Sequence, residues 1–241
     1  REVKWDRAPA DQKRNADSRP NIVLILADDL GWNDLTIGGG GVADGSAPTP
    51  NIDAIGSEGI QFTNGYSGHS SCAPSRASLM SGRYPTRFGF EFTPTPGSML
   101  KVISSIIEEQ KGLPHSITHF DEHVDKVVPY EEMGMPTEEI TLAETLKKGG
   151  YHTVHIGKWH LGRYNGMAAK DQGFDESLLM HSGMYLPEDD PNVVNSKQDF
   201  DPIDKFLWKG MQYAASFNSG DVFKPGGYLT DYYTDEAVKT I

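Results

Sequence analysis

Residues 141–160 read TLAETLKKGGYHTVHIGKWH and predict a helix followed at once by a strand. Thr141 and Glu144 have the spacing of a capping box, in which each side chain satisfies a free backbone N–H group at the helix start. Gly149–Gly150 can end that helix, because glycine readily adopts the left-handed conformation that closes a helix. The β-branched and apolar residues within 152–156 then predict a strand.

A second region with this alternation precedes the first in the chain. Residues 21–27, NIVLILA, form an unbroken apolar run of the kind that is buried on both faces of a parallel sheet. Thr49–Pro50 predicts the start of a helix that Gly59 can end, and residues 60–63 alternate like a short strand. The alternation of strands and helices predicts an α/β fold with a largely parallel central sheet flanked by helices.

The rest of the sequence indicates one domain with additions. Residues 1–19 are polar and predict an extended lead-in, whereas residues 20–241 carry the alternating pattern. Within the latter, residues 88–136 are Pro-rich and predict an insertion-like excursion from the core. A helical pattern at residues 235–241 lacks a C-cap, so we expect the domain to continue beyond Ile241.

Composition excludes several classes of protein. The chain has 241 residues, 37% of them hydrophobic, and a formal net charge of -12, which suits a globular protein and disfavours general nucleic-acid binding. No apolar run approaches the roughly 20 residues of a membrane-spanning helix, so no transmembrane segment is expected. The single Cys cannot form an internal disulfide. Residues 38–41 lack the Gly-Lys-Ser/Thr of a phosphate-binding loop and predict a plain loop.

That single cysteine, Cys72, precedes a predicted helix that begins near Pro74 and carries Arg76 in its first turns. The positive end of a helix dipole favours an anion at such a position, and a guanidinium can bind an oxyanion. Spacing alone leaves two interpretations open: a reactive site, or a small cysteine buried beside a helix.

Polar residues also follow both predicted strands. Asp28 and Asp29 come directly after residues 21–27, and two adjacent carboxylates fit a hard divalent cation, although a solvated turn explains them equally well. Lys158 and His160 follow the second strand, where the alternative is a surface lysine and a structural histidine. Because ligands of open α/β sheets bind beyond the carboxyl ends of the strands, these four side chains are candidates for one site.

Two long motifs give the chain a resemblance to a known family. Residues 72–76, CAPSR, continued by LMSGR at 79–83, match the C-x-P-S-R signature of the type I sulfatases of the alkaline phosphatase superfamily. Residues 150–160 match the second signature of that family. Further similarity covers its opening strand and first helix, at residues 21–30 and 49–53. The resemblance implies hydrolysis of a sulfate ester, of a sulfated carbohydrate or an aryl alcohol, to the alcohol and inorganic sulfate.

The resemblance also implies that Cys72 acts as Cα-formylglycine, which a formylglycine-generating maturation system makes by oxidising the cysteine. One hydroxyl of the hydrated aldehyde attacks the sulfur of the ester and expels the alcohol. Loss of a proton from the second hydroxyl then releases sulfate. A sulfatase of this type is expected to be periplasmic or secreted.

Family roles transfer to single positions of this sequence. Asp28, Asp29 and the modified Cys72 would bind a divalent cation, calcium in most relatives, with magnesium as an alternative. Arg76 would hold the diol. The family's remaining metal and sulfate ligands are not found before Ile241, in agreement with the expectation that the domain continues.

The sulfate group itself would be bound by residues that follow the second strand. By this resemblance, Lys158 would bind a sulfate oxygen, and His160 would hydrogen-bond the diol and act as the base that triggers sulfate release. His181 or Ser182 is a further candidate for a sulfate contact.

Three alternatives stay open. A phosphonate monoester or phosphodiester hydrolase of the same superfamily can use the same groups, and a catalytically inactive sulfoglycan-binding protein could retain the pocket. His115, His119 and His123 are spaced four apart and could share a helix face as a zinc site, whereas a solvated insert is the simpler interpretation.

Overall fold

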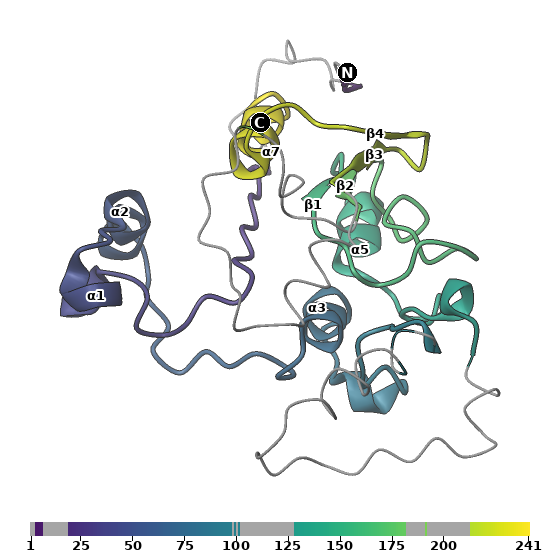
Figure 1. Ribbon diagram of the computed structural model, residues 1–241, viewed down its shortest axis with the longest axis horizontal. Helices are drawn as coiled ribbons and strands as arrows, with labels where there is room; N and C mark the ends of the chain where they lie inside the picture. Colours follow the sequence, from purple (N-terminus) through teal and green to yellow (C-terminus); the bar gives the residue numbers. More distant parts are fainter. Residues whose placement is uncertain are drawn as a thin grey trace. The chain divides into compact units, whose positions relative to one another are not determined.

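The computed structural model describes residues 3–6, 19–97, 99, 101, 128–181, 191 and 213–241 (Figure 1). The chain forms two compact units. One comprises residues 15–67, and the other comprises residues 1–14 together with residues 68–241. In the described part of the chain, no helix is long and apolar enough to cross a membrane.

A mixed four-stranded sheet organises the larger unit. Its described strands, labelled in Figure 1, lie in the order β1 (Val154–Gly157), β2 (Glu176–Met180), β3 (Ala215–Phe217) and β4 (Val222–Phe223). β1 and β2 are parallel and pair Gly157 with Leu179, whereas β2–β3 and β3–β4 are antiparallel. The carboxyl ends of β1 and β2 therefore meet at one edge of the sheet, where a ligand site is expected.

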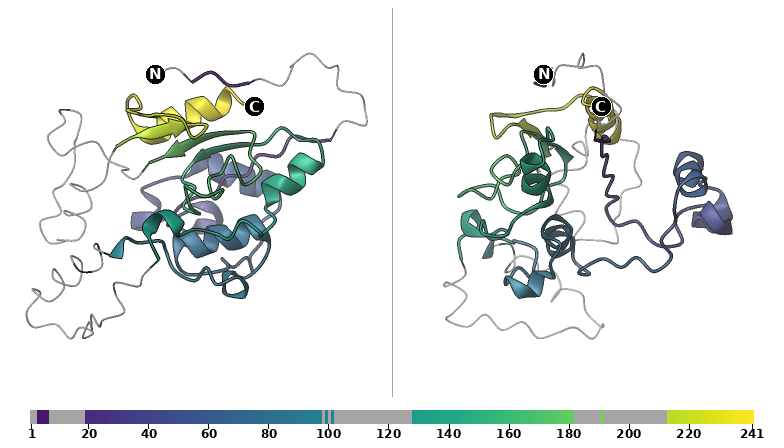
Figure 2. Two further views of the ribbon diagram at one scale, coloured as in Figure 1. Left: turned by 90° about the vertical axis from the view of Figure 1, so that its right-hand side faces the viewer. Right: turned by 180° about the vertical axis from the view of Figure 1, so that it is seen from behind.

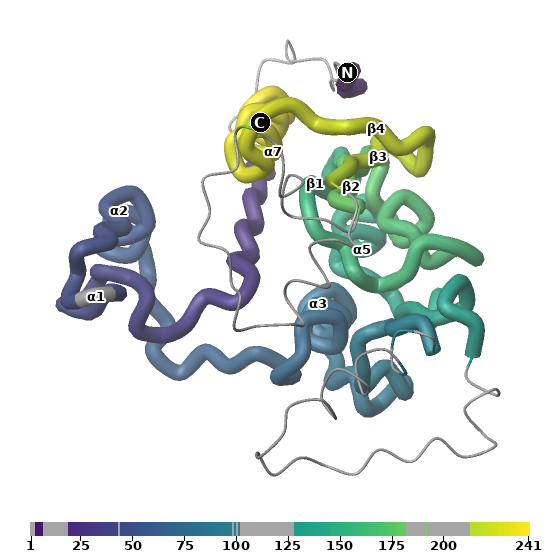
Figure 3. The backbone as a smooth tube through the Cα atoms, in the orientation of Figure 1, coloured from purple at the N-terminus to yellow at the C-terminus, as the bar shows by residue number. Residues whose placement is uncertain are grey.

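Helix α5 (Leu142–Lys148) confirms the capping box predicted from the sequence. The Thr141 Oγ1 atom accepts a hydrogen bond from Glu144 N at 3.0 Å, and Thr141 N donates to Glu144 Oε2 at 2.7 Å. The chain then continues into β1 (Figure 3). The strand begins two residues later than predicted. Just before it, Thr153 N donates to the Asp175 side chain at 2.9 Å, and the Thr153 hydroxyl donates to the Gly173 carbonyl at 2.7 Å.

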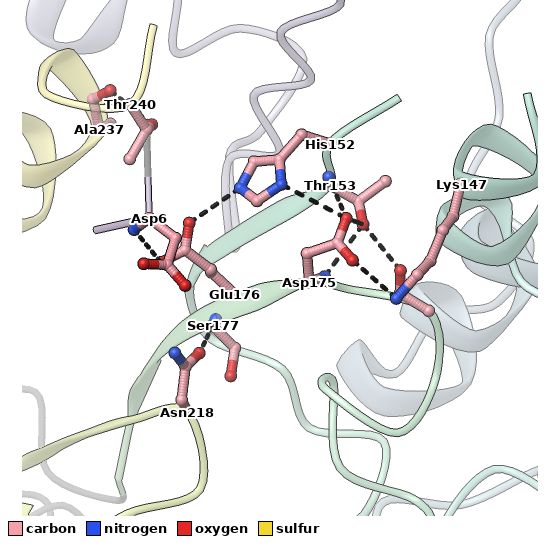
Figure 4. Close-up of polar contacts among 11 residues, drawn as sticks. Asp6, Lys147, His152, Thr153, Asp175, Glu176, Ser177, Asn218, Ala237 and Thr240 are labelled. Atoms are coloured by element: carbon pink, nitrogen blue, oxygen red, sulfur yellow. Dashed lines mark hydrogen bonds and ion pairs between the residues drawn. The ribbon is translucent and has the colours of Figure 1, made fainter. Parts of the chain in front are cut away.

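A cluster of charged side chains joins α5, β1 and β2 at the amino ends of the strands (Figure 4). His152 Nε2 lies 2.8 Å from Glu176 Oε2, and its Nδ1 lies 3.6 Å from Asp175 Oδ2. Lys147 Nζ lies 2.7 Å from Asp175 Oδ1. Glu176 is only 3% exposed and also accepts a hydrogen bond from Asp6 N at 2.8 Å. These contacts fix the register at the edge opposite to the candidate site.

The described part of the lead-in packs on the sheet and on α7 (Leu229–Val238), which Figure 2 shows beside the strands. Val3 is buried with Leu178, and the Trp5 ring meets the Phe217 ring edge-on at 5.0 Å. Trp5 Nε1 donates to Glu236 Oε2 at 2.8 Å. The helix predicted at residues 235–241 is part of a longer one that begins at Leu229. It ends at Val238 and is capped by Lys239, so the prediction of an uncapped helix that runs to Ile241 is wrong.

Helix α3 (Cys72–Ser81) confirms the helix predicted near Pro74. Its Ala73 and Ala77 are fully buried against a cluster that contains Trp159 and Leu161 from the loop after β1. Gly82 ends the helix in the left-handed conformation, with φ at 66°, and its N–H group donates to Ser78 O. The shared core holds the two sulfatase-like motifs together. The described part of this unit also contains two short 3₁₀ helices, η2 (Pro85–Arg87) and η4 (Tyr130–Glu132).

Residues 15–67 contain three helices: η1 (Ile37–Gly39), α1 (Val42–Gly45) and α2 (Pro50–Glu58). The start of α2 is confirmed, although the Thr49 hydroxyl donates to Asp53 Oδ1 at 2.8 Å and does not cap the backbone.

The strands predicted at residues 21–27 and 60–63 are not formed, and the side chains of Ile22 to Leu26 are 47% to 80% exposed. A strand buried on both faces needs backbone partners, and within residues 19–67 the structure describes no strand that could supply them.

The α/β class is confirmed, with parallel pairing in the described sheet confined to β1 and β2. The domain limits at residues 20–241 and the excursion at 88–136 stay predictions. The histidines of the proposed zinc alternative, His115, His119 and His123, lie outside the described residues.

Candidate active site

Cys72 is the first residue of α3, which begins two residues before the start predicted near Pro74. Its side chain is half-buried, and its Sγ atom lies 3.7 Å from Thr93 Oγ1. The preceding Ser71 is extended, and its N–H group donates to His69 Nδ1 at 3.0 Å, which orders the turn into the helix. Cys72 therefore lies where free backbone N–H groups and the helix dipole stabilise negative charge.

Arg76 connects α3 to the loop after β1. Its Nη1 atom donates a hydrogen bond to the Lys158 carbonyl oxygen at 2.5 Å. This contact brings together two motifs that the sequence placed 82 residues apart. Because the guanidinium is anchored to the backbone of the second motif, its position relative to that loop is fixed.

Trp159 anchors the loop between Lys158 and His160. It is 4% exposed, and its Nε1 atom donates to the Met167 carbonyl at 2.9 Å. The adjacent Lys158 and His160 are half-buried. His160 has a positive φ of 64°, an uncommon conformation for a residue with a Cβ atom, which requires support from its surroundings.

His155, in β1, is a neighbour of Arg76 that sequence reasoning missed. Its ring packs edge-on against Trp159 at 5.3 Å and Phe174 at 5.2 Å, and its Nδ1 atom is buried without a hydrogen-bond partner among the described residues. Burial, and then the positive charge of Arg76, lowers the pKa of His155 to about 4. His155 is therefore neutral at neutral pH. Its only signal in the sequence is its place within the strand.

His181 directly follows β2, at the same sheet edge as Lys158. Its N–H group donates to the Ala214 carbonyl at 2.8 Å, and its own carbonyl accepts a hydrogen bond from Arg163 Nη2. Burial, and then the charge of Arg163, lowers the pKa of His181. Ser182 lies outside the described residues, so its proposed sulfate contact stays a prediction.

Asp28 and Asp29 belong to residues 15–67, whereas the other candidates belong to the larger unit. Both carboxylates are exposed, and Asp29 has a positive φ of 57°. Their oxygens suit calcium or magnesium, but two carboxylates are fewer than the six to eight oxygens that calcium takes. Among the described residues, no group of three or more His, Cys, Asp or Glu side chains forms a metal site. A metal site shared with Cys72 stays a prediction.

A cysteine at a helix start, with an arginine of that helix bonded to a loop that carries a lysine and a histidine at the sheet edge, agrees with the class of enzyme that the motifs predicted. The sulfatase family model matches residues 20–241, and the chain belongs to the sulfatase family.

Three similar proteins illustrate the relationship. The chain is 36% identical over 227 residues to human N-acetylgalactosamine-6-sulfatase, covering 92% of this chain and 36% of that protein. It is 36% identical over 157 residues to rat arylsulfatase G, covering 65% and 23%. The solved structure of Ps i-CgsB in complex with k-i-k-neocarrahexaose is 27% identical with a TM-score of 0.60, covering 92% of this chain and 41% of that one. The chain thus spans about two fifths or less of the length of these relatives.

Proposed function

We propose that the protein is a sulfuric ester hydrolase that cleaves a sulfate ester to an alcohol and inorganic sulfate. The observation that carries the proposal is the hydrogen bond from Arg76 to the Lys158 carbonyl, because it unites the two sulfatase motifs at one sheet edge. Membership of the sulfatase family supports the same reaction.

Each residue of the larger unit has a chemical task in this proposal. Formylglycine formed from Cys72 supplies, when hydrated, one hydroxyl that attacks sulfur and a second whose deprotonation allows sulfate to leave. Arg76 extends from α3, is fixed by its hydrogen bond to the Lys158 carbonyl, and orients this diol. Lys158 binds a sulfate oxygen and offsets charge in the transition state, and His160 takes the proton from the second hydroxyl.

Asp28 and Asp29 would hold a divalent cation, calcium or magnesium. Such a cation supplies positive charge that polarises the sulfate oxygens and favours the ionised nucleophile. These carboxylates are the type of ligand that calcium and magnesium prefer, and two adjacent carboxylates repel each other unless a cation lies between them. At Cys72 itself, the positive end of the α3 dipole favours negative charge on the nucleophile.

The substrate that we favour is a sulfated carbohydrate. The human relative is named for N-acetylgalactosamine 6-sulfate, and the solved relative holds a neocarrahexaose. Aryl sulfates are the second choice, in keeping with the name of arylsulfatase G. We also propose a periplasmic or secreted location, together with a formylglycine-generating maturation system as a partner.

Parallel hydrolysis assays test the proposal. The full-length protein, produced with a maturation system, would be given matched sulfate, phosphate and phosphonate esters of one alcohol. We expect sulfate release that is abolished in Cys72→Ala and strongly reduced in Cys72→Ser, because a serine sulfate has no second hydroxyl to expel the group. Preferred phosphate or phosphonate hydrolysis would assign the alternative reaction, and binding of sulfated glycans without turnover would assign an inactive binding protein.

A further inference from the structure

Arg163 extends the candidate site along the sheet edge. Gly157 at the end of β1 pairs with Leu179 of β2, so Lys158 and the residues after Leu179 leave the sheet at the same edge. Arg163 reaches this edge, because its Nη2 atom bonds the carbonyl oxygen of His181, the residue directly after β2. Arg76 is anchored to the same edge through the Lys158 carbonyl.

The loop that carries Arg163 is closely packed on both sides. Leu161 is 1% exposed, and its carbonyl accepts a hydrogen bond from Met135 N at 2.9 Å. Gly162 has a φ of 113°, and a Cβ atom there would lie 2.5 Å from the Met167 Cβ atom. Met167 is itself buried, and its N–H group donates to the Tyr164 carbonyl. Arg163 therefore projects from a backbone that is fixed before any ligand binds.

Among the described residues, no carboxylate neutralises the charge of Arg163. Within the ranges that the structure describes, its hydrogen-bond acceptor is the His181 carbonyl, and no Asp or Glu forms an ion pair with it. A guanidinium carries five N–H donors, so one carbonyl uses a small part of its capacity. Burial, and then the charge of Arg163, lowers the pKa of His181 and favours its neutral form. The His181 N–H group donates a hydrogen bond to the Ala214 carbonyl, and this bond holds the His181 carbonyl in place.

We propose that Arg163, held by the His181 backbone, forms a second anion-binding subsite that recognises an oxyanion on the sugar next to the sulfate ester. A planar guanidinium can bind either a carboxylate or a second sulfate through two parallel hydrogen bonds. This proposal rests on the proposed function, since it names the class of substrate as a glycan with a further anionic group. In a protein with a net charge of -12, such a fixed cation also favours the approach of anionic chains.

Equilibrium binding separates this proposal from catalysis. Full-length protein carrying Cys72→Ala, which cannot turn over, would be titrated calorimetrically with three probes. These probes are N-acetylgalactosamine 6-sulfate, the same sugar linked to a uronic acid, and the same sugar linked to a second sulfated sugar. Each titration would be repeated with Arg163→Gln, Arg163→Lys and Lys170→Gln, the last being an exposed cation in the same part of the chain.

We expect Arg163→Gln to lower the affinity for one or both two-anion probes by about tenfold more than the affinity for the one-anion probe. A difference of this size is typical of a lost charged hydrogen-bond pair. The two-anion probe that responds identifies the group as carboxylate or sulfate. Arg163→Lys keeps the positive charge but loses the planar pair of N–H donors, so it should lose part of this preference. Lys170→Gln should change the affinity for every probe by less than about twofold. If thermal unfolding shows that Arg163→Gln is misfolded, Arg163→Lys tests the proposal instead, through its loss of preference for the two-anion probes.

Equal weakening of all probes would show that Arg163 only supports the His181 loop and would overturn the proposal, as would failure to bind either two-anion probe. A preference for two-anion probes in a parent protein that hydrolyses no sulfate ester would leave the subsite standing and refute the proposed function.

Discussion

The guanidinium of Arg76 and the main-chain carbonyl of Lys158 lie 2.5 Å apart, as donor and acceptor of one hydrogen bond. Through this bond, the helix that begins at Cys72 and the loop that follows β1 form one structural element. Ala73 and Ala77 lie in the same buried cluster as Trp159, and this packing stabilises the arrangement. Any displacement of Arg76 is therefore expected to affect both motifs.

Arg76→Met should lower both stability and activity, because it removes a charged donor and leaves the Lys158 carbonyl without this partner. We expect a loss of about 1.5–3 kcal/mol in the free energy of unfolding. Arg83→Met is the matched control, since Arg83 is 45% exposed and its ion pair with Glu139 should contribute about 1 kcal/mol or less. Denaturant unfolding and kcat/KM check the pair of variants, and equal effects in both would contradict the role of Arg76.

His155 should make the protein less stable in mild acid. Its folded pKa of about 4 lies below the ordinary value of 6.5, so between these values the unfolded state binds more protons than the folded state. This contribution to stability is complete above pH 6.5 and is lost as the pH falls towards 4. It amounts to about 2 kcal/mol between pH 7 and pH 5.

The test of His155 compares unfolding curves of the natural sequence and of His155→Phe at both pH values. Phenylalanine keeps an aromatic ring against Trp159 and Phe174 but cannot ionise. Other groups, such as Asp175, titrate equally in both proteins and cancel in the comparison. The account predicts a smaller acid loss in the variant, and an identical loss in both proteins would show that His155 is not the group responsible.

Asp28→Asn and Asp29→Asn should each lose bound metal together with activity. Each substitution removes a negative charge from the cation's ligands while preserving side-chain size. Glu58→Gln, an exposed carboxylate at the end of α2, is the control and should retain both. Elemental analysis and sulfate release provide the measurements. Chelation should inactivate the full-length protein and calcium or magnesium should restore it, so full activity after complete metal removal would refute this part of the account.

Lys158→Ala and His160→Ala should change the kinetics of sulfate release in different ways. Lys158→Ala removes a charge that acts in binding and in the transition state, so both kcat and KM should worsen. His160→Ala removes the base for the second step only, so alcohol should be released in a burst without an equal release of sulfate. Rapid mixing with separate detection of the two products distinguishes these patterns. A stable and fully active His160→Ala protein would remove His160 from the mechanism.

Local sequence patterns predicted the local structure well. The capping box of Thr141 and Glu144 is formed as expected, and α3 begins at Cys72, within two residues of the predicted start. These features depend on contacts within a few residues, which a pattern can encode. The motifs also placed Lys158 and His160 correctly after a strand.

Contacts between distant residues could not be predicted in the same way. The apolar run at residues 21–27 has the composition of a buried strand, but composition does not name a partner strand, and the described segment is unpaired and exposed. Likewise, nothing local indicates that Arg163 bonds the His181 carbonyl or that His155 lies beside Arg76. Both relationships arise from the parallel pairing of β1 with β2 and from the packing of α3.

The mass of the peptide that contains residue 72 tests the central claim most directly. In full-length protein that releases sulfate from a sulfate ester, we predict formylglycine at this position, and the conversion of the –CH2SH group to –CHO lowers the peptide mass by about 18 Da. The fraction of molecules whose aldehyde is labelled by a hydrazide should equal the fraction of molecules that is active. An unmodified Cys72 throughout a fully active preparation would contradict the account.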